Sequence, residues 1–343
     1  MQALISYWAD QLLASGLSAS SVYQILVGKG SSSTYFNAYK YDLTGFFGLA
    51  PKLTKAEFKM CLEQAGSPAQ LSEASLNKIN TSIQVRNGLV NPRQCKIFAE
   101  FFELFIQVLV NYRLGASNYV PTSPDINIQT LVKSLIRAIG KKQLVPFSQQ
   151  LYQDLGQLLT DWPSWQADLL VASYQHAELP ALTGDQVAVH LKLEPAYLPL
   201  LQQACYQRLW REMASDSRPA LSLIKTGLAQ VLYPYSDSCQ QTRLAKQSGL
   251  RLTAIAQARQ LKPSTISDHY IEIAIFEPKL LLDEWQALMG QPYQPGLSEK
   301  FTDYQTFQSI YPHQPFWCFR FAEILDIRVE RSCSGASLLS AIK

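Results

Sequence analysis

The sequence predicts a mainly α fold with an N-terminal helical domain, a helical middle bundle and a C-terminal helix-turn-helix module. Three observations support this. Apolar residues recur at helical spacing through most of the chain. Strong hairpin chemistry is confined to a single Asn-Gly pair. Residues 250–273 have the spacing of two short helices joined by a tight turn, and this stretch is the most specific of the three.

Residues 1–120 are predicted to form the N-terminal domain. Polar residues precede several of its amphipathic stretches, and Thr54 is suited to cap one of them. The turn at 28–33 is rich in glycine and serine and separates two of these stretches. The helices expected here are 3–14, 18–27, 34–48, 53–65 and 92–112.

A hairpin is indicated around Asn87-Gly88, because these residues tolerate the positive φ angles of a tight turn and apolar residues flank them. A small hairpin after helices is typical of a winged helix, so the N-terminal domain is predicted to be helical or winged-helix-like. The alternative is an ordinary loop that leads into the apolar helix at 92–112. The apolar run at 98–110 is too short and too often interrupted by polar residues to cross a membrane.

Residues 115–124, GASNYVPTSP, are rich in turn formers and predict a linker. Residues 125–235 then predict a helical bundle, because leucines keep helical period and prolines punctuate the stretch. The helix-turn-helix domain is expected at 237–331. Its further helices are predicted at 239–248, 279–289, 300–310 and 316–325.

In the helix-turn-helix, Ala256 is expected where the two helices cross, because steeply crossing helices need a small side chain at their closest approach. Leu261 and Ile266 are expected to pack on either side of it. Pro263 marks the first position of the second helix, where its missing N–H has no partner to lose. Gln260 occupies the turn position where many such motifs have glycine.

The charge pattern around this motif predicts a binding surface. The charged residues from 243 to 262 are all cations and give +5, whereas residues 264–284 carry a net −4. The cationic half favours contact with DNA phosphates. Alternatively, the acidic second helix could dock on a basic protein surface. Base-specific reading is less supported, because the second helix exposes short side chains. The residues predicted to bind DNA or a partner are Arg243, Lys246, Arg251, Arg259, Lys262, Ser264, Thr265, Ser267 and Asp268.

No catalytic signature is evident, so the sequence predicts a protein that is not an enzyme and has no cofactor and no small-molecule substrate. The Gly28-Lys29 pair is not a phosphate loop, since Tyr23 and Gly30 hold the positions that need Gly and Ser or Thr. The four histidines and six cysteines are isolated, which predicts no metal site. His269 is expected to be packed in the core with one local hydrogen bond.

Composition predicts a cytoplasmic protein. The formal net charge is +3, so the protein does not coat nucleic acid by bulk charge. Scattered cysteines without a Cys-x-x-Cys pair are typical of reduced thiols. No signal peptide and no membrane association are expected.

Two stretches carry a family resemblance. The first comprises Ser21–Leu26, Gly28-Lys29, Ser32-Ser33, Leu43-Thr44 and Phe46–Gly48; the second comprises Thr242, Leu244, Gly249, Ile255-Ala256, Arg259, Leu261, Ser264–Ile266 and His269. In this order they resemble the YpbB family, firmicute proteins associated with RecQ-type helicases. The resemblance implies a non-enzymatic accessory protein whose partner is a RecQ-type helicase, with DNA as a further expected partner in repair or recombination. The alternatives are a stand-alone DNA-binding transcriptional regulator and a protein-interaction scaffold with a degenerate helix-turn-helix.

Overall fold

The computed structural model describes residues 2–63, 73–84, 92–172, 174, 180–213, 218–229 and 231–333. All regular secondary structure in these ranges is helical, with eighteen α-helices and four short 3-10 helices. The predicted mainly α fold is therefore confirmed. The Asn87-Gly88 pair, and with it the predicted hairpin, lies outside the described residues.

The chain forms two compact units, and each unit is built from two stretches of sequence. Unit 1 comprises residues 1–28 and 44–234, and unit 2 comprises 29–43 and 235–343. This division differs from the three consecutive domains that the sequence predicts. The linker expected at 115–124 lies within unit 1, where Gln107 donates to the carbonyl of Val120 and accepts from the N–H of Thr122, both at 3.0 Å. Residues 29–43, expected in the N-terminal domain, belong to unit 2.

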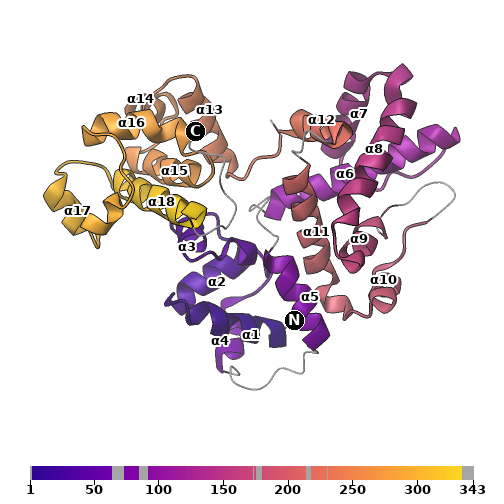
Figure 1. The fold of residues 1–343 in the computed structure, drawn as a ribbon, viewed down its shortest axis with the longest axis horizontal. Helices are drawn as coiled ribbons and strands as arrows, with labels where there is room; N and C mark the ends of the chain where they lie inside the picture. Colours follow the sequence, from indigo (N-terminus) through magenta and orange to yellow (C-terminus); the bar gives the residue numbers. More distant parts are fainter. Residues whose placement is uncertain are drawn as a thin grey trace. The chain divides into compact units, whose positions relative to one another are not determined.

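The longest helix of unit 1 is the apolar α6 (Pro92–Leu114), which packs against α7 (Ile126–Ile139), α8 (Leu144–Thr160) and α11 (Leu198–Glu212). Four phenylalanines of α6 are fully buried, and Phe98 lies edge-on to Trp210 with 5.2 Å between ring centroids. The other α-helices of unit 1 are α1 (Gln2–Leu13), α2 (Ala19–Val27), α4 (Lys55–Glu63), α5 (Glu73–Gln84), α9 (Ser164–Val171), α10 (Gly184–Leu191) and α12 (Pro219–Leu228) (Figure 1). The 3-10 helices of unit 1 are η1 (Thr44–Phe46), η2 (Lys141–Gln143) and η3 (Pro195–Tyr197).

Gly28 has a structural role at the end of α2. Its φ of +71° places it in the left-handed region, and a Cβ there would lie 2.9 Å from the Cα of Gly48. Only glycine allows this backbone approach without displacement. The glycine-rich turn after α2 is thus explained by helix termination and close packing.

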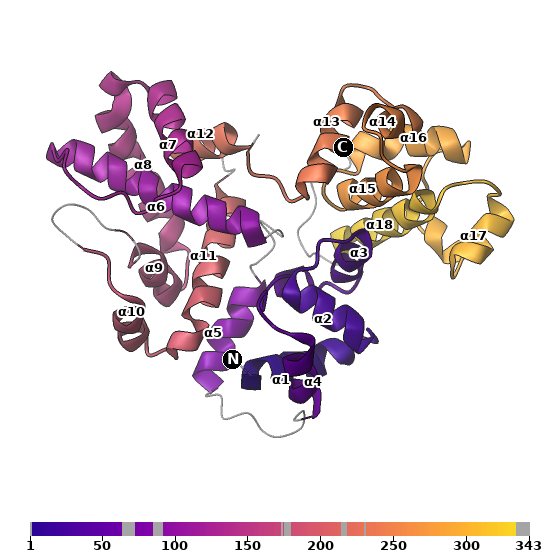
Figure 2. The same ribbon diagram turned by 180° about the vertical axis from the view of Figure 1, so that it is seen from behind.

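Unit 2 is arranged around α15 (Pro263–Phe276), which contacts every other long helix of the unit. From Tyr270 to Ile275 all six of its residues are buried, and Figure 2 shows α15 among its neighbours. A helix that is buried on all sides is a core element. The other elements of unit 2 are α3 (Ser32–Lys40), α13 (Asp237–Gln247), α14 (Leu252–Ala258), α16 (Lys279–Met289), η4 (Leu297–Lys300), α17 (Tyr304–Ile310) and α18 (Phe316–Cys333).

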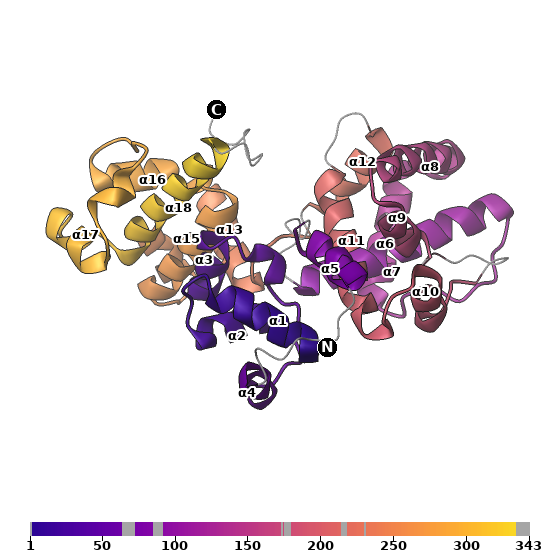
Figure 3. The same cartoon turned by 60° about the horizontal axis from the view of Figure 1, so that its bottom comes forward.

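Helix α3 comes from the N-terminal region yet forms part of the core of unit 2. Tyr35, Phe36 and Tyr39 are each at most 5% exposed, and Tyr35 lies edge-on to Phe276 of α15. Figure 3 shows α3 next to α15 and α18. The helix predicted at 34–48 is shorter than expected, because Asp42 adopts a φ of +56° and the N–H of Leu43 closes the last turn on Ala38.

Candidate helix-turn-helix site

The predicted helix-turn-helix consists of α14, a tight turn at 259–262, and α15. The turn has the hydrogen bonds of a Schellman motif: the N–H of Leu261 donates to Ala256 at 3.0 Å, and that of Gln260 donates to Gln257 at 3.2 Å. Gln260 is the residue in the left-handed region, with a φ of +53°. The position where glycine is common therefore has the same backbone geometry here, with glutamine in its place.

The packing residues of the motif are placed as the sequence predicted. Ala256 is 5% exposed, and Ile255 and Ile266 are fully buried. Leu261 is half-buried in the turn. Pro263 begins α15, with Lys262 as the extended residue before it. A small residue at the crossing lets α14 and α15 approach closely.

Three of the five predicted binding cations form structural bonds within unit 2. Nε of Arg243 lies 2.8 Å from Oε1 of Glu277, and Nζ of Lys246 lies 2.5 Å from Oε2 of Glu284. The guanidinium of Arg259 donates to the carbonyl of Ser238 at 2.7 Å and to the hydroxyl of Thr242. The cationic and acidic stretches of the sequence thus pair with each other.

Arg251 and Lys262 are the two predicted cations that remain exposed. They occupy equivalent places, since each is the extended residue immediately before a helix, Arg251 before α14 and Lys262 before α15. Among the residues that the structure describes, neither has an ion pair within 4.0 Å. Both side chains therefore face solvent.

The polar residues of α15 are concentrated in its first two turns. Ser264 is exposed, and Thr265 and Ser267 are half-buried. Asp268 is exposed, but its carboxylate accepts a hydrogen bond of 2.7 Å from the hydroxyl of Ser32, at the start of α3. The predicted face of the second helix is thus short and partly occupied by α3, because the rest of α15 lies in the core.

His269 is packed in the core, as predicted, with its Nδ1 2.7 Å from the hydroxyl of Thr242. Burial and the neighbouring Arg259 guanidinium lower the pKa of His269 to about 4. The ring is therefore neutral at pH 7. Its role is to link α15 to α13 through Thr242, which also accepts from Arg259.

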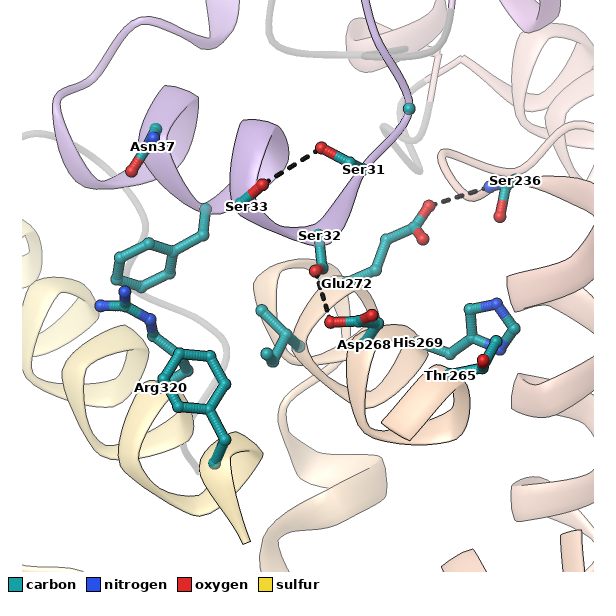
Figure 4. A pocket seen from close by; sticks show the side chains of 14 residues that line it. Ser31, Ser32, Ser33, Asn37, Ser236, Thr265, Asp268, His269, Glu272 and Arg320 are labelled. Atoms are coloured by element: carbon teal, nitrogen blue, oxygen red, sulfur yellow. Dashed lines mark hydrogen bonds between the residues drawn. The ribbon is translucent and has the colours of Figure 1, made fainter. Parts of the chain in front are cut away.

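A cleft of about 560 Å³ lies beside the first turns of α15, between α3 and α18, with Ser236 before α13 also lining it (Figure 4). Glu272 lines it, almost fully buried, and accepts a hydrogen bond of 2.9 Å from the N–H of Ser236. Burial raises the pKa of Glu272 to about 7. On the opposite wall the Arg320 guanidinium lies 4.2 Å from the centre of the Phe36 ring. Sequence reasoning missed this cleft because α3 is more than 200 residues away in the chain.

The residues that the structure describes contain neither a candidate metal site nor a helix that could span a membrane. No group of three or more His, Cys, Asp or Glu side chains in those ranges is arranged to hold a metal ion. Of the helices in the same ranges, none has the length and apolar character needed to cross a bilayer. The six cysteines form no disulfide, and five of them are buried.

The chain is similar to protein YpbB of Bacillus subtilis (strain 168), with 23% identity over 302 residues. The similarity covers 80% of this chain and 82% of that protein. No model of a protein family matches the chain, and no solved structure matches it either. The relationship therefore extends through both units and is not confined to the helix-turn-helix.

Proposed function

We propose that the protein is a non-enzymatic accessory factor of DNA metabolism that contacts duplex DNA phosphates through its helix-turn-helix. The observation that carries this proposal is the pair Arg251 and Lys262, exposed cations immediately before α14 and α15. A helix-turn-helix meets the DNA backbone and major groove with this part of its two helices. Ser264 adds an exposed hydroxyl next to Lys262.

Binding through this surface is expected to be largely independent of sequence. Base-specific reading needs side chains such as Arg, Asn or Gln on the exposed part of the second helix. The first two turns of α15 offer Ser264 and Asp268 in exposed positions, and Asp268 is bonded to Ser32. The geometry therefore favours an accessory factor over a stand-alone transcriptional regulator.

The proposal is tested with the full chain and a labelled 20-base-pair duplex, by fluorescence anisotropy at several salt concentrations. Arg251→Glu and Lys262→Glu should each weaken binding and reduce the slope of log K against log salt by roughly 0.9, the value for one phosphate contact. Lys300→Glu, at an exposed cation of η4, is the matched control. Equal behaviour of all three variants would count against the proposal.

A protein partner is a second candidate function of unit 2, and a RecQ-type helicase is the partner that the family resemblance implies. The observation that favours it is the exposure of three leucines on or beside α13 and α16: Leu244 at 44%, and Leu250 and Leu288 at 38% each. A contiguous exposed apolar patch marks protein interfaces, and the ion pair between Lys246 and Glu284 holds together α13 and α16, which carry Leu244 and Leu288. Titration of the chain with a purified RecQ-type helicase, comparing wild type with Leu244→Ser, tests this: loss of binding in the variant supports docking, and no binding by wild type refutes it.

A further inference from the structure

A second surface of unusual charge lies in unit 1, on the helical bundle. Residues 112–153 contain five cations and one acid, a net charge of +4, whereas the whole chain has +3. The acid is Asp125, which caps the start of α7 by accepting from the N–H of Asn127 at 2.8 Å. The five cations are Arg113, which precedes Asp125, and Lys133, Arg137, Lys141 and Lys142, which follow it.

Part of this charge gathers where α6 ends and α8 begins. The hydroxyl of Tyr112, in the last turn of α6, lies 3.4 Å from the carbonyl of Lys141 in η2. Arg113 lines a shallow hollow together with Gln149, Tyr152 and Gln153 of α8. Figures 1 and 2 show α6, α7 and α8 side by side. The last turn of α6 thus lies against α8 and η2, with Arg113 beside the middle of α8 and Tyr112 beside Lys141.

These cations are solvent-exposed. Arg113, Lys141 and Lys142 are all exposed, and within the described part of the chain none of them has a carboxylate within 4.0 Å. Cations at helix C-termini are favoured by the helix dipole, which accounts for some of this placement. The dipole gives no reason for an aromatic ring among them.

Tyr152 is that ring, and it is 77% exposed, the largest value for any aromatic side chain whose burial is described. Tyr112, 37% exposed, lies on the neighbouring helix. The amides of Gln149 and Gln153 flank Tyr152 on α8, one turn and one residue away. An exposed ring beside an exposed arginine and two amides, with two further exposed lysines just before the start of the same helix, is a combination that suits unpaired bases and their phosphates, since bases stack on aromatic faces and cations follow the backbone.

We propose that this surface, formed by Tyr112, Arg113, Lys141, Lys142, Gln149, Tyr152 and Gln153, binds single-stranded nucleic acid. Tyr152 stacks on an unpaired base, and Arg113 with the two lysines contacts phosphates on either side. Duplex is disfavoured as the ligand here because its bases are already stacked on one another and cannot reach the ring. The surface is separate from the helix-turn-helix and needs no residue of unit 2.

The test uses the full chain and a fluorescently labelled 20-nucleotide thymidine strand. Tyr152→Ala should weaken binding about tenfold, in line with the loss of one stacked base. Lys141→Glu/Lys142→Glu should also weaken it and reduce the salt slope by roughly 1.4, because each phosphate contact on a single strand contributes about 0.7. The matched control is Lys52→Glu/Lys55→Glu, two exposed cations of unit 1 at the start of α4, which packs on α1.

Two comparisons separate this proposal from simpler explanations. Inorganic polyphosphate, which has charge but no bases, should lose affinity for the lysine variant and keep it for Tyr152→Ala. Tyr152→Ala should leave duplex binding unchanged, so a failure of the helix-turn-helix proposal, measured with Arg251→Glu on duplex, is distinguishable from a failure of this one. The inference is overturned if the wild-type chain does not bind the strand, if Tyr152→Ala and the lysine variant match the control, or if duplex depends on Tyr152 to the same degree. Thermal unfolding of each variant confirms that the fold is retained.

Discussion

Gln260 holds a backbone conformation that its side chain opposes, and this gives a prediction with a defined sign. Its φ of +53° lies in the left-handed region, where the Cβ of an ordinary residue costs about 1–2 kcal/mol. Glycine removes this cost, but it loses about 0.5–1 kcal/mol more backbone entropy on folding. The Gln260 side chain is exposed, so its removal sacrifices little packing. Gln260→Gly should therefore stabilise the protein by about 0.5–1 kcal/mol.

The matched control is Gln257→Gly, three residues earlier and inside α14, the helix that ends just before the turn. Gln257 is also exposed but lies inside α14, with no positive φ. Glycine within a helix costs close to 1 kcal/mol, so Gln257→Gly should destabilise the protein by about 0.5–1 kcal/mol. The two variants remove the same side chain and should shift stability in opposite directions.

Thermal unfolding followed by circular dichroism measures both effects. For a chain of 343 residues, 1 kcal/mol corresponds to about 1–2 °C, so Gln260→Gly should raise the midpoint by about 1 °C and Gln257→Gly should lower it by a similar amount. A lower midpoint for Gln260→Gly would refute the reasoning, because it would mean that Gln260 does not occupy the left-handed region in solution.

Further predictions concern the charged groups of unit 2. The raised pKa of Glu272, about 7, means that its contribution to stability is present below pH 4.5 and is lost as pH rises through 7. Glu272→Gln should therefore be more stable than wild type by up to about 3 kcal/mol at pH 8 and by much less at pH 5. Urea unfolding at the two pH values measures this difference. The lowered pKa of His269, about 4, has the opposite sign, so its contribution is present above pH 6.5 and is lost towards pH 4; His269→Gln should remove this loss. Lys246→Met should cost about 3 kcal/mol because it leaves Glu284, whose side chain is only 9% exposed, without its cation, whereas Arg243→Met, at a more exposed pair, should cost at most about 1 kcal/mol. If Lys246→Met and Arg243→Met lowered the free energy of unfolding equally, the difference in exposure between the two ion pairs would not explain their contributions to stability.

The helix-turn-helix could be predicted from sequence because its determinants are local. The small Ala256, the apolar Ile266 ten residues later and Pro263 at the helix start all act within one short stretch. Local signals also placed most of the other helices. The conformation of Gln260 was less accessible, since glutamine carries no preference for a positive φ and the tertiary turn imposes it.

The charge pairing and the composition of unit 2 could not be predicted, because both depend on contacts between distant residues. Arg243 and Glu277 are 34 residues apart, and Ser32 and Asp268 are 236 residues apart. A cationic stretch followed by an acidic one has the same sequence pattern whether the two pair internally or face different partners. Only the fold distinguishes the two, and it brings these helices together around α15.

Helix α15 serves both as the second helix of the motif and as the central core helix of unit 2, and this limits which variants can report on DNA binding. Reversing the charge of Arg243 or Lys246 would break an internal ion pair, and reversing Arg259 would remove its bonds to Ser238 and Thr242. Lost DNA affinity in such variants would not distinguish a missing phosphate contact from a disturbed fold. Arg251 and Lys262 avoid this ambiguity, since both are exposed and precede their helices. A DNA-binding role for unit 2 is therefore decided by these two positions, with the stability of Lys246→Met measured separately.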